Sequence, residues 1–285
     1  MNQENLAGFL SVATFPLARR RPSCQHGDMP EAHRTNQLAN NWSPVELAGH
    51  TCRVFEPSRP SEHGFVVIYL HCSEAAPLAR FPAFTEQFER FGLRVIEPVS
   101  GRSWWTDRIW PEFDASISAE AYVLARVVPY VEERWGSKPP RLALLGVSMG
   151  GQAALRIAYK FPNVFPTVAA ISPAIDFQKR IAEGVDPGLD LMYGDEESAR
   201  QDTATLHIHP LNWPRNQFFC CDPMDVRWHE SADRLRMKLS SLGVPYDCDL
   251  ETEAGGHSFT YASHMAARAI EFLAGRLELE RRRVI

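Results

Sequence analysis

The chain has 285 residues, of which 45% are hydrophobic and 23% are charged, an ordinary globular composition. Its formal net charge of −5 gives no reason to expect nucleic acid or an anionic membrane as a partner. No apolar run approaches the roughly 18–20 residues that a membrane-spanning helix needs. These properties exclude the basic nucleic-acid binders and the helical membrane proteins.

The six cysteines show no C-x-x-C spacing, which disfavours a disulfide framework or a zinc site and favours free thiols in a reducing compartment. The first residues also lack the basic region of a secretory signal. We therefore expect a cytoplasmic location. Residues 1–40 carry no sustained periodicity and are predicted to form a poorly ordered extension, followed by a single domain over residues 41–285.

The predicted elements begin with a hairpin over residues 45–55, whose alternating residues turn at Ala48-Gly49-His50. Residues 65–70 are continuously apolar, which is typical of a strand buried on both faces of a parallel sheet. Further helices are predicted at 76–90, 116–135 (ended by Gly136), 152–160, 230–242 and 259–277, and further strands at 93–98, 141–145, 167–171, 217–221 and 246–251.

This alternation of strands and helices predicts an α/β fold, with a mostly parallel central sheet and helices on both of its faces. Residues 177–215 interrupt the alternation and are expected to form a small irregular cap over the edge of the sheet. No internal repeat or low-complexity tract suggests another architecture.

One motif, G-x-S-x-G, lies at Gly146, Ser148 and Gly150, between a predicted strand and a predicted helix. In that setting the motif forms a sharp turn that strains the serine backbone and lifts its hydroxyl above the sheet. The helix N-terminus that follows favours developing negative charge. We therefore predict that Ser148 is a nucleophile.

A serine nucleophile needs an imidazole to take its proton and a carboxylate to orient that imidazole. In the α/β-hydrolase order the acid and then the histidine follow successive strands. His257 follows the last predicted strand, in a loop with two glycines, and is the predicted base. Asp225 is the preferred acid because it lies a few residues past a strand end. Asp222, which can initiate a turn with Pro223, remains the alternative.

An oxyanion hole needs two backbone donors, and we expect them to be the N–H groups of Met149 and Cys72. His71 precedes Cys72, directly after the strand predicted over residues 65–70, and is a candidate residue of the substrate pocket. Trp104 and Trp105, in the loop 101–110, are two more. The tryptophans fit an apolar wall or a sugar-stacking platform, but packing of the loop onto the body is favoured slightly.

His207 and His209 have the spacing of two metal ligands on a strand, but no nearby acid or cysteine cluster completes such a site. No metal or cofactor is therefore predicted. His264 lies within the last predicted helix and is interpreted as a surface or packing residue.

The sequence resembles the esterase D group, which includes S-formylglutathione hydrolases, feruloyl and acetyl-xylan esterases, and mycolyltransferases. The resemblance spans about residues 60–275. It is carried by the nucleophile motif at 146–151, the helix with Tyr122 and Pro129-Tyr130, Ser172-Pro173 and His257-Ser258. It implies the nucleophile Ser148, the acid Asp225 and the base His257. Cys72 in place of a glycine, and Asp222-Pro223 before the acid, depart from the family pattern and leave the substrate subclass open.

We thus predict a serine hydrolase that cleaves a small-molecule carboxylic ester or thioester through an acyl-enzyme. An acyltransferase with the same triad is one alternative, and a catalytically silent binding protein of the α/β-hydrolase fold is another. The sequence leaves a homo-oligomer open.

Overall fold

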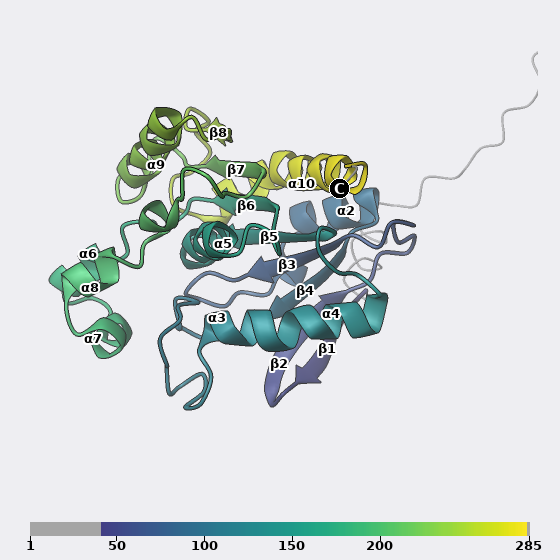
Figure 1. The fold of residues 1–285 in the computed structure, drawn as a ribbon, viewed down its shortest axis with the longest axis horizontal. Coiled ribbons are helices and arrows are strands. Elements are labelled where there is room, and N and C mark those ends of the chain that lie inside the picture. Colours follow the sequence, from purple (N-terminus) through teal and green to yellow (C-terminus); the bar gives the residue numbers. More distant parts are fainter. Residues whose placement is uncertain (1–40, 284–285) are drawn as a thin grey trace, which may run out of the picture.

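An eight-stranded sheet forms the centre of the fold in the computed structural model, which describes residues 41–283 (Figure 1). The extension predicted over residues 1–40 lies outside the described residues. The spatial order of the strands is β1-β2-β4-β3-β5-β6-β7-β8. The strands are β1 (Trp42–Leu47), β2 (His50–Phe55), β3 (Val66–Leu70), β4 (Arg94–Pro98), β5 (Leu142–Val147), β6 (Thr167–Ile171), β7 (Asn216–Cys220) and β8 (Asp247–Asp249).

In this spatial order every pair of neighbouring strands from β4 to β8 is parallel. Only the pairs β1–β2 and β2–β4 are antiparallel. The hairpin between β1 and β2 turns at Ala48 and Gly49, whose φ angles are 50° and 84°. Positive φ at both positions is what a two-residue hairpin loop requires. The predicted edge hairpin and the mostly parallel sheet are therefore confirmed.

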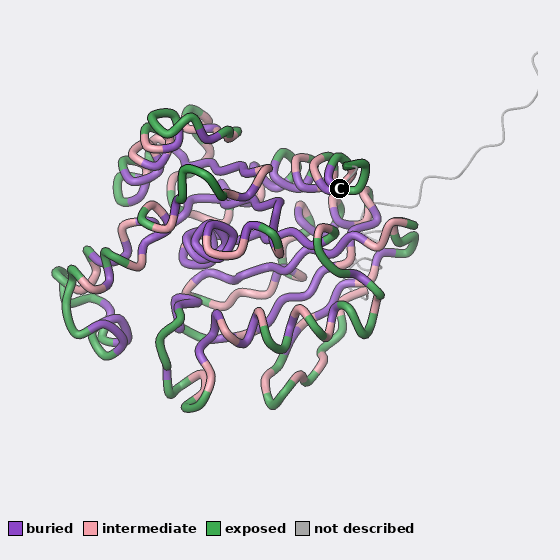
Figure 2. Tube along the Cα trace, viewed as in Figure 1, coloured by how far each residue is buried: buried purple, intermediate pink, exposed green. Residues whose placement is uncertain are grey.

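Helices cover both faces of the sheet, as predicted (Figures 1 and 2). One face packs on α2 and α10, and the other on α3 to α5 and α9. Adjacent strand residues alternate between the two cores, so Cys220 lies in one and Cys221 in the other. The helices of the two layers are α2 (Pro82–Phe91), α3 (Ala119–Tyr122), α4 (Val128–Trp135), α5 (Met149–Lys160), α9 (His229–Leu242) and α10 (Phe259–Arg281).

Two predicted helices differ in detail from those observed. The segment predicted as a helix over 76–90 contains a short 3₁₀ turn, η1 (Leu78–Arg80), before α2. The long helix predicted over 116–135 begins after Ser118 and contains a π-helical turn, η2 (Val123–Val127), between α3 and α4. Pro129 lacks the N–H that would continue the regular ladder, so the wider π turn fits the chain around it. The helix ends at Gly136, as expected.

The segment 177–215, expected to be irregular, contains short helices joined by turns, and the helices make up about half of it (Figure 1). It contains α6 (Lys179–Ala182), α7 (Pro187–Tyr193), α8 (Glu196–Arg200) and the 3₁₀ turn η3 (Ala204–His207). Helices of four to seven residues are too short to show a convincing period in the sequence. We call this segment, residues 177–215, the cap segment.

A buried arginine joins the cap segment to the sheet layer. Arg156, on α5, is 1% exposed and pairs with Glu120 of α3. Its Nε donates to Asp202 Oδ1 (2.7 Å) and its Nη2 to Asp202 Oδ2 (2.8 Å). Tyr193 and His207 also contact the Asp202 carboxylate. A buried charge is tolerated only when it is paired in this way, so the network fixes the cap segment against α5.

No helix within residues 41–283 is both long and apolar enough to cross a membrane.

The turn between β5 and α5 brings backbones too close for side chains. A Cβ on Gly150 would overlap the carbonyl oxygen of Leu70, and one on Gly146 would overlap that of Gly150. Glycine is required at both positions for this steric reason. The close approach sets the position of the loop that follows β3.

We expect Gly150→Ala to lower the free energy of unfolding by at least the ~1–3 kcal/mol typical of over-packed cores. Gly275→Ala is the matched control, because Gly275 is an exposed residue of α10 with no atom within 4 Å of an added Cβ. That control should be more stable than wild type by ~0.5–1 kcal/mol. Urea unfolding followed by circular dichroism measures both, and equal stability of the two variants would contradict the steric argument.

Candidate active site

Ser148 lies between β5 and α5 with φ 55° and ψ −115°, a conformation rarely adopted by a residue with a side chain. Three backbone hydrogen bonds fix this turn: Ser148 N–H donates to Ile171 (2.9 Å), and Gln152 and Ala174 donate to the Ser148 carbonyl (both 3.0 Å). Strain of this kind costs about 1–3 kcal/mol and is concentrated at functional sites. The sequence prediction of a strained serine at a strand-to-helix turn agrees with this geometry.

His257 connects Ser148 to Asp225. The Ser148 Oγ lies 2.9 Å from His257 Nε2, and His257 Nδ1 lies 2.7 Å from Asp225 Oδ2. Asp225 is buried and its other oxygen accepts from the N–H of Trp228 (3.2 Å). The imidazole itself is more than one-third exposed. The Asp225 carboxylate is therefore fixed inside the protein, while the His257 ring is open to solvent.

Asp222, the alternative acid, contacts the backbone of the histidine loop. Its Oδ2 accepts from the N–H groups of Ala254 (2.7 Å) and Gly256 (2.8 Å), and its Oδ1 from Met224 (2.7 Å). Burial alone would raise the pKa of Asp222, but these hydrogen bonds outweigh burial and hold the pKa below its ordinary value. The turn they fix has positive φ at Gly255 and Gly256, as the two-glycine loop predicted.

Met149 and Cys72 line the same pocket as Ser148. Neither N–H donates a hydrogen bond to any residue in the part of the chain that the structure describes. Burial raises the pKa of the Cys72 thiol, so the thiol is protonated near neutral pH and is a poor nucleophile. This arrangement suits the backbone role expected of Cys72.

His71 and Trp105 do not line the pocket as the sequence suggested, because both side chains are fully buried. Burial lowers the pKa of His71 to about 4, so its ring is neutral near pH 7. Its Nε2 accepts from the Ser100 N–H (3.0 Å), which leaves Nδ1 to donate to the Cys72 carbonyl (2.6 Å). Trp105 donates to the His71 carbonyl (3.2 Å). Both residues hold the loop that carries the Cys72 N–H.

The pocket beside Ser148 has a volume of about 360 Å³. Trp104 lines it, as expected, although the side chain is largely buried. Ser172 and Arg180 also line the pocket, and sequence reasoning missed both. Ser172 directly follows β6, at the carboxyl edge where ligands bind in α/β sheets, so its position could have been found. Arg180 lies in the cap segment, where no sequence period indicated its place.

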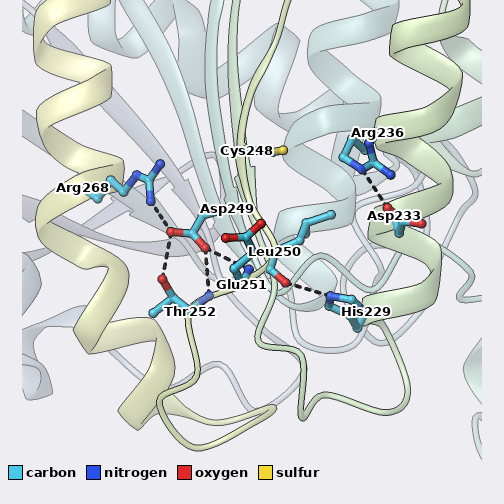
Figure 3. Close-up of a pocket in the computed structure, with 9 residues that line it drawn as sticks. All are labelled: His229, Asp233, Arg236, Cys248, Asp249, Leu250, Glu251, Thr252 and Arg268. Carbon is cyan, nitrogen blue, oxygen red and sulfur yellow. Dashed lines mark hydrogen bonds and ion pairs between the residues drawn. The ribbon is translucent and has the colours of Figure 1, made fainter.

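A larger cavity, of about 750 Å³, lies at the β8 edge of the sheet (Figure 3). Four of its charged groups are paired with one another, Asp249 with Arg268 and Arg236 Nε with Asp233 (2.7 Å), whereas Glu251 is exposed. His229 Nε2 contacts the Leu250 carbonyl (3.0 Å) rather than a nucleophile. The Thr252 hydroxyl donates to Asp249 (2.9 Å), a carboxylate already paired with Arg268, whereas in the smaller pocket an imidazole contacts the Ser148 hydroxyl. The smaller pocket is therefore the candidate active site.

The other histidines singled out in the sequence have separate partners. His207 Nε2 lies 2.9 Å from Asp202 Oδ1, whereas His209 Nδ1 accepts from the N–H of Leu211 (3.1 Å). Within residues 41–283 no group of three or more His, Cys, Asp or Glu side chains could hold a metal ion. His264 is exposed on α10, in agreement with its interpretation as a surface residue.

The chain is similar to esterases and acyltransferases in two sequence comparisons. The model of a protein family described as "Putative esterase" matches residues 94–261, more than half of the chain. Diacylglycerol acyltransferase/mycolyltransferase Ag85B of Mycobacterium intracellulare is 28% identical over 141 residues, or 47% of this chain. The match spans only 41% of that relative's length.

Solved structures share the fold. An S-formylglutathione hydrolase from Agrobacterium tumefaciens has a TM-score of 0.65 at 18% identity, covering 83% of this chain and 94% of its own. FphF of Staphylococcus aureus, described as a fluorophosphonate-binding serine hydrolase, has a TM-score of 0.61 at 18% identity, covering 82% and 98%. At such low identities these similarities establish the α/β-hydrolase fold and nothing finer.

Replacing the two aspartates separately should have different effects. Asp225→Asn removes the charge beside His257 and should lower kcat for an ester substrate by about 10³–10⁴-fold, with little change in stability. Asp222→Asn turns one acceptor oxygen into a donor that faces backbone donors, and should act mainly on stability. Steady-state kinetics and thermal unfolding of both variants test this division. A larger loss of kcat in Asp222→Asn would reverse it.

The stability that Asp222 contributes should depend on pH. Its pKa is lowered in the folded state, so the contribution is complete above the unfolded-state pKa of about 3.9 and is lost as pH falls through the folded-state value. The stability difference between wild type and Asp222→Asn should therefore be constant near neutral pH and shrink below about pH 4. Urea unfolding at a series of pH values measures it, and a difference that does not shrink would contradict the lowered pKa.

Proposed function

Because the chain belongs to the family described as "Putative esterase", we propose that it is a serine hydrolase that cleaves a carboxylic ester or thioester through an acyl-enzyme on Ser148. One observation carries the proposal: the Ser148 hydroxyl, the His257 imidazole and the Asp225 carboxylate form a continuous hydrogen-bonded series beside a pocket. A serine near neutral pH becomes nucleophilic only with such a base at hand.

In this mechanism His257 carries its proton on Nδ1, and this N–H donates a hydrogen bond to Asp225. Nε2 is therefore free to accept the proton of the Ser148 hydroxyl. As Ser148 Oγ bonds to the acyl carbon, its proton moves to Nε2. The buried carboxylate of Asp225 stabilises the imidazolium that forms. His257 then returns the proton to the leaving alkoxide or thiolate as its bond to the acyl carbon breaks.

The negative charge of the tetrahedral intermediate requires donors that are already in place. The N–H groups of Met149 and Cys72 are assigned this role, because both line the pocket and neither has an acceptor within the described residues. Removal of one such donor typically costs about 10²–10³-fold in kcat. In the second half of the reaction, water attacks the acyl carbon as its proton moves to His257. The bond between the acyl carbon and Ser148 Oγ then breaks, and His257 returns the proton to Ser148 Oγ while the acid leaves.

The substrate is a small molecule. A pocket of about 360 Å³ lies near the lower end of the roughly 300–1,000 Å³ common for ligand sites, which favours a short acyl group. Acyl transfer to an alcohol is the second candidate, favoured by the similarity of half the chain to an acyltransferase. Both reactions share the acyl-enzyme, and the exposed edge of His257 can activate water or an alcohol. A catalytically silent binding protein would have no use for this proton relay.

Ser148→Ala should lower kcat for 4-nitrophenyl butyrate by at least about 10⁴-fold, because the acyl-enzyme has no other nucleophile. A fluorophosphonate probe should label wild type and not the variant. The temperature of thermal unfolding should stay similar, because alanine, like serine, has a Cβ and so the backbone strain at position 148 is the same in both proteins. Undiminished turnover or labelling in Ser148→Ala would refute the proposal. Product analysis with an added alcohol then separates hydrolysis from transfer.

A further inference from the structure

Arg180, on α6 of the cap segment, lines the same pocket as Ser148. Arg180 takes no part in the acyl-enzyme mechanism proposed for Ser148. A cation beside a reacting ester is a strong electrostatic feature in a partly buried site, where charges are screened less than in water. An anionic group of the substrate is the natural partner of such a guanidinium.

Two side chains, Asp186 and Trp104, contact the guanidinium of Arg180. Asp186 is 2% exposed, and its Oδ2 accepts from Trp104 Nε1 (3.0 Å) and lies 3.4 Å from Arg180 Nε. The Arg180 Cζ also lies 5.9 Å from the centre of the Trp104 ring, within the range of a cation–π contact. Trp104 is itself stacked on Phe177, with ring centres 5.3 Å apart. The position of Arg180 is therefore built into the pocket.

The hydrogen-bonding capacity of Arg180 is almost unused. Its Nε is buried and has no hydrogen-bond partner, and its other guanidinium nitrogens donate to no residue within the described chain. Asp186 compensates the charge of Arg180 without occupying its planar fork. Such a fork matches the two oxygens of a carboxylate.

A second pocket arginine provides the contrast. Arg227 also lines the pocket, but its Nη1 donates to Glu183 (2.7 Å) and its side chain is 45% exposed. It is therefore partnered and solvated where Arg180 is neither fully paired nor open. The one acidic side chain among the lining residues, Glu74, is exposed.

We propose that Arg180 binds a carboxylate carried by the substrate, so that the enzyme prefers esters or thioesters bearing an acid group close to the scissile bond. The inference rests on the proposed function in one respect, since it takes Ser148 as the nucleophile. The carboxylate belongs either to the acyl group or to the leaving group, and the two cases need separate substrates.

Two matched pairs of esters test the proposal. 4-Nitrophenyl butyrate and the 4-nitrophenyl monoester of succinate differ by an acid on the acyl side. Phenyl butyrate and 4-carboxyphenyl butyrate differ by an acid on the leaving-group side. For each pair the measured quantity is the ratio of kcat/KM for the anionic ester to that for the neutral ester, which cancels general losses of activity.

In wild type we expect this ratio to exceed one in one of the two pairs. That pair shows whether the carboxylate belongs to the acyl group or to the leaving group. Arg180→Gln should lower this ratio by about 10–100-fold, the size of a lost charge-assisted hydrogen bond. Arg180→Lys, which keeps the charge without the fork, should lower it less. Arg108→Gln is the control and should leave the ratio unchanged, because Arg108 lies over the Tyr193 ring and outside the pocket.

The outcomes separate the inference from the proposed function. If the neutral esters are cleaved with dependence on Ser148 but Arg180→Gln leaves both ratios unchanged, the inference alone is overturned. A ratio that falls in Arg227→Gln instead overturns it as well. If no ester is cleaved and Ser148 is not labelled, the proposed function fails and takes the inference with it. Should Arg180→Gln not fold by circular dichroism, an unchanged ratio in Arg180→Lys overturns the inference.

Discussion

The close approach of the β5–α5 turn to the loop after β3 is the constraint on which the site depends. Gly150 leaves no room for a Cβ beside the carbonyls of Leu70 and His71. The same contact that demands glycine also brings Cys72 to the pocket that Ser148 and Met149 line. Backbone packing therefore decides where the two proposed oxyanion donors, Met149 and Cys72, lie, and that packing also sustains the strained backbone of Ser148.

Two aspartates on one loop perform different physical tasks. Asp222 accepts three backbone N–H bonds and so fixes the turn that carries His257, whereas Asp225 contacts the imidazole itself. A misplaced loop would move the base even with Asp225 intact. Since catalytic geometry tolerates errors of only about 0.5 Å, the proposed role of Asp225 depends on the hydrogen bonds that Asp222 makes to the backbone.

The elements that the sequence predicted well are those with long local signals. The buried strands, the glycine turn at Ser148 and the two-glycine loop at His257 each follow from neighbouring residues alone. Trp104 and Trp105 show why the rest could not be predicted: they are adjacent, both have φ near 53°, and only Trp104 reaches the pocket. The side-chain periodicity of a strand or a helix cannot predict which way a residue points when its backbone has a positive φ. The place of Arg180 depends likewise on long-range contacts of the cap segment.

Two arginines at the boundary between the cap segment and the rest of the protein have opposite surroundings. Arg156 of α5 is buried and fully paired with carboxylates, including Asp202 of the cap segment, so this contact fixes the segment and offers nothing to a ligand. Arg180 extends from the cap segment to the pocket with its fork unoccupied. In the proposed function the sheet edge supplies the reacting groups, whereas the cap segment supplies a charge for which the proposed acyl transfer has no role. Substrate choice is therefore expected to reside in the cap segment, where the chain is free to differ without disturbing the strained turn at Ser148.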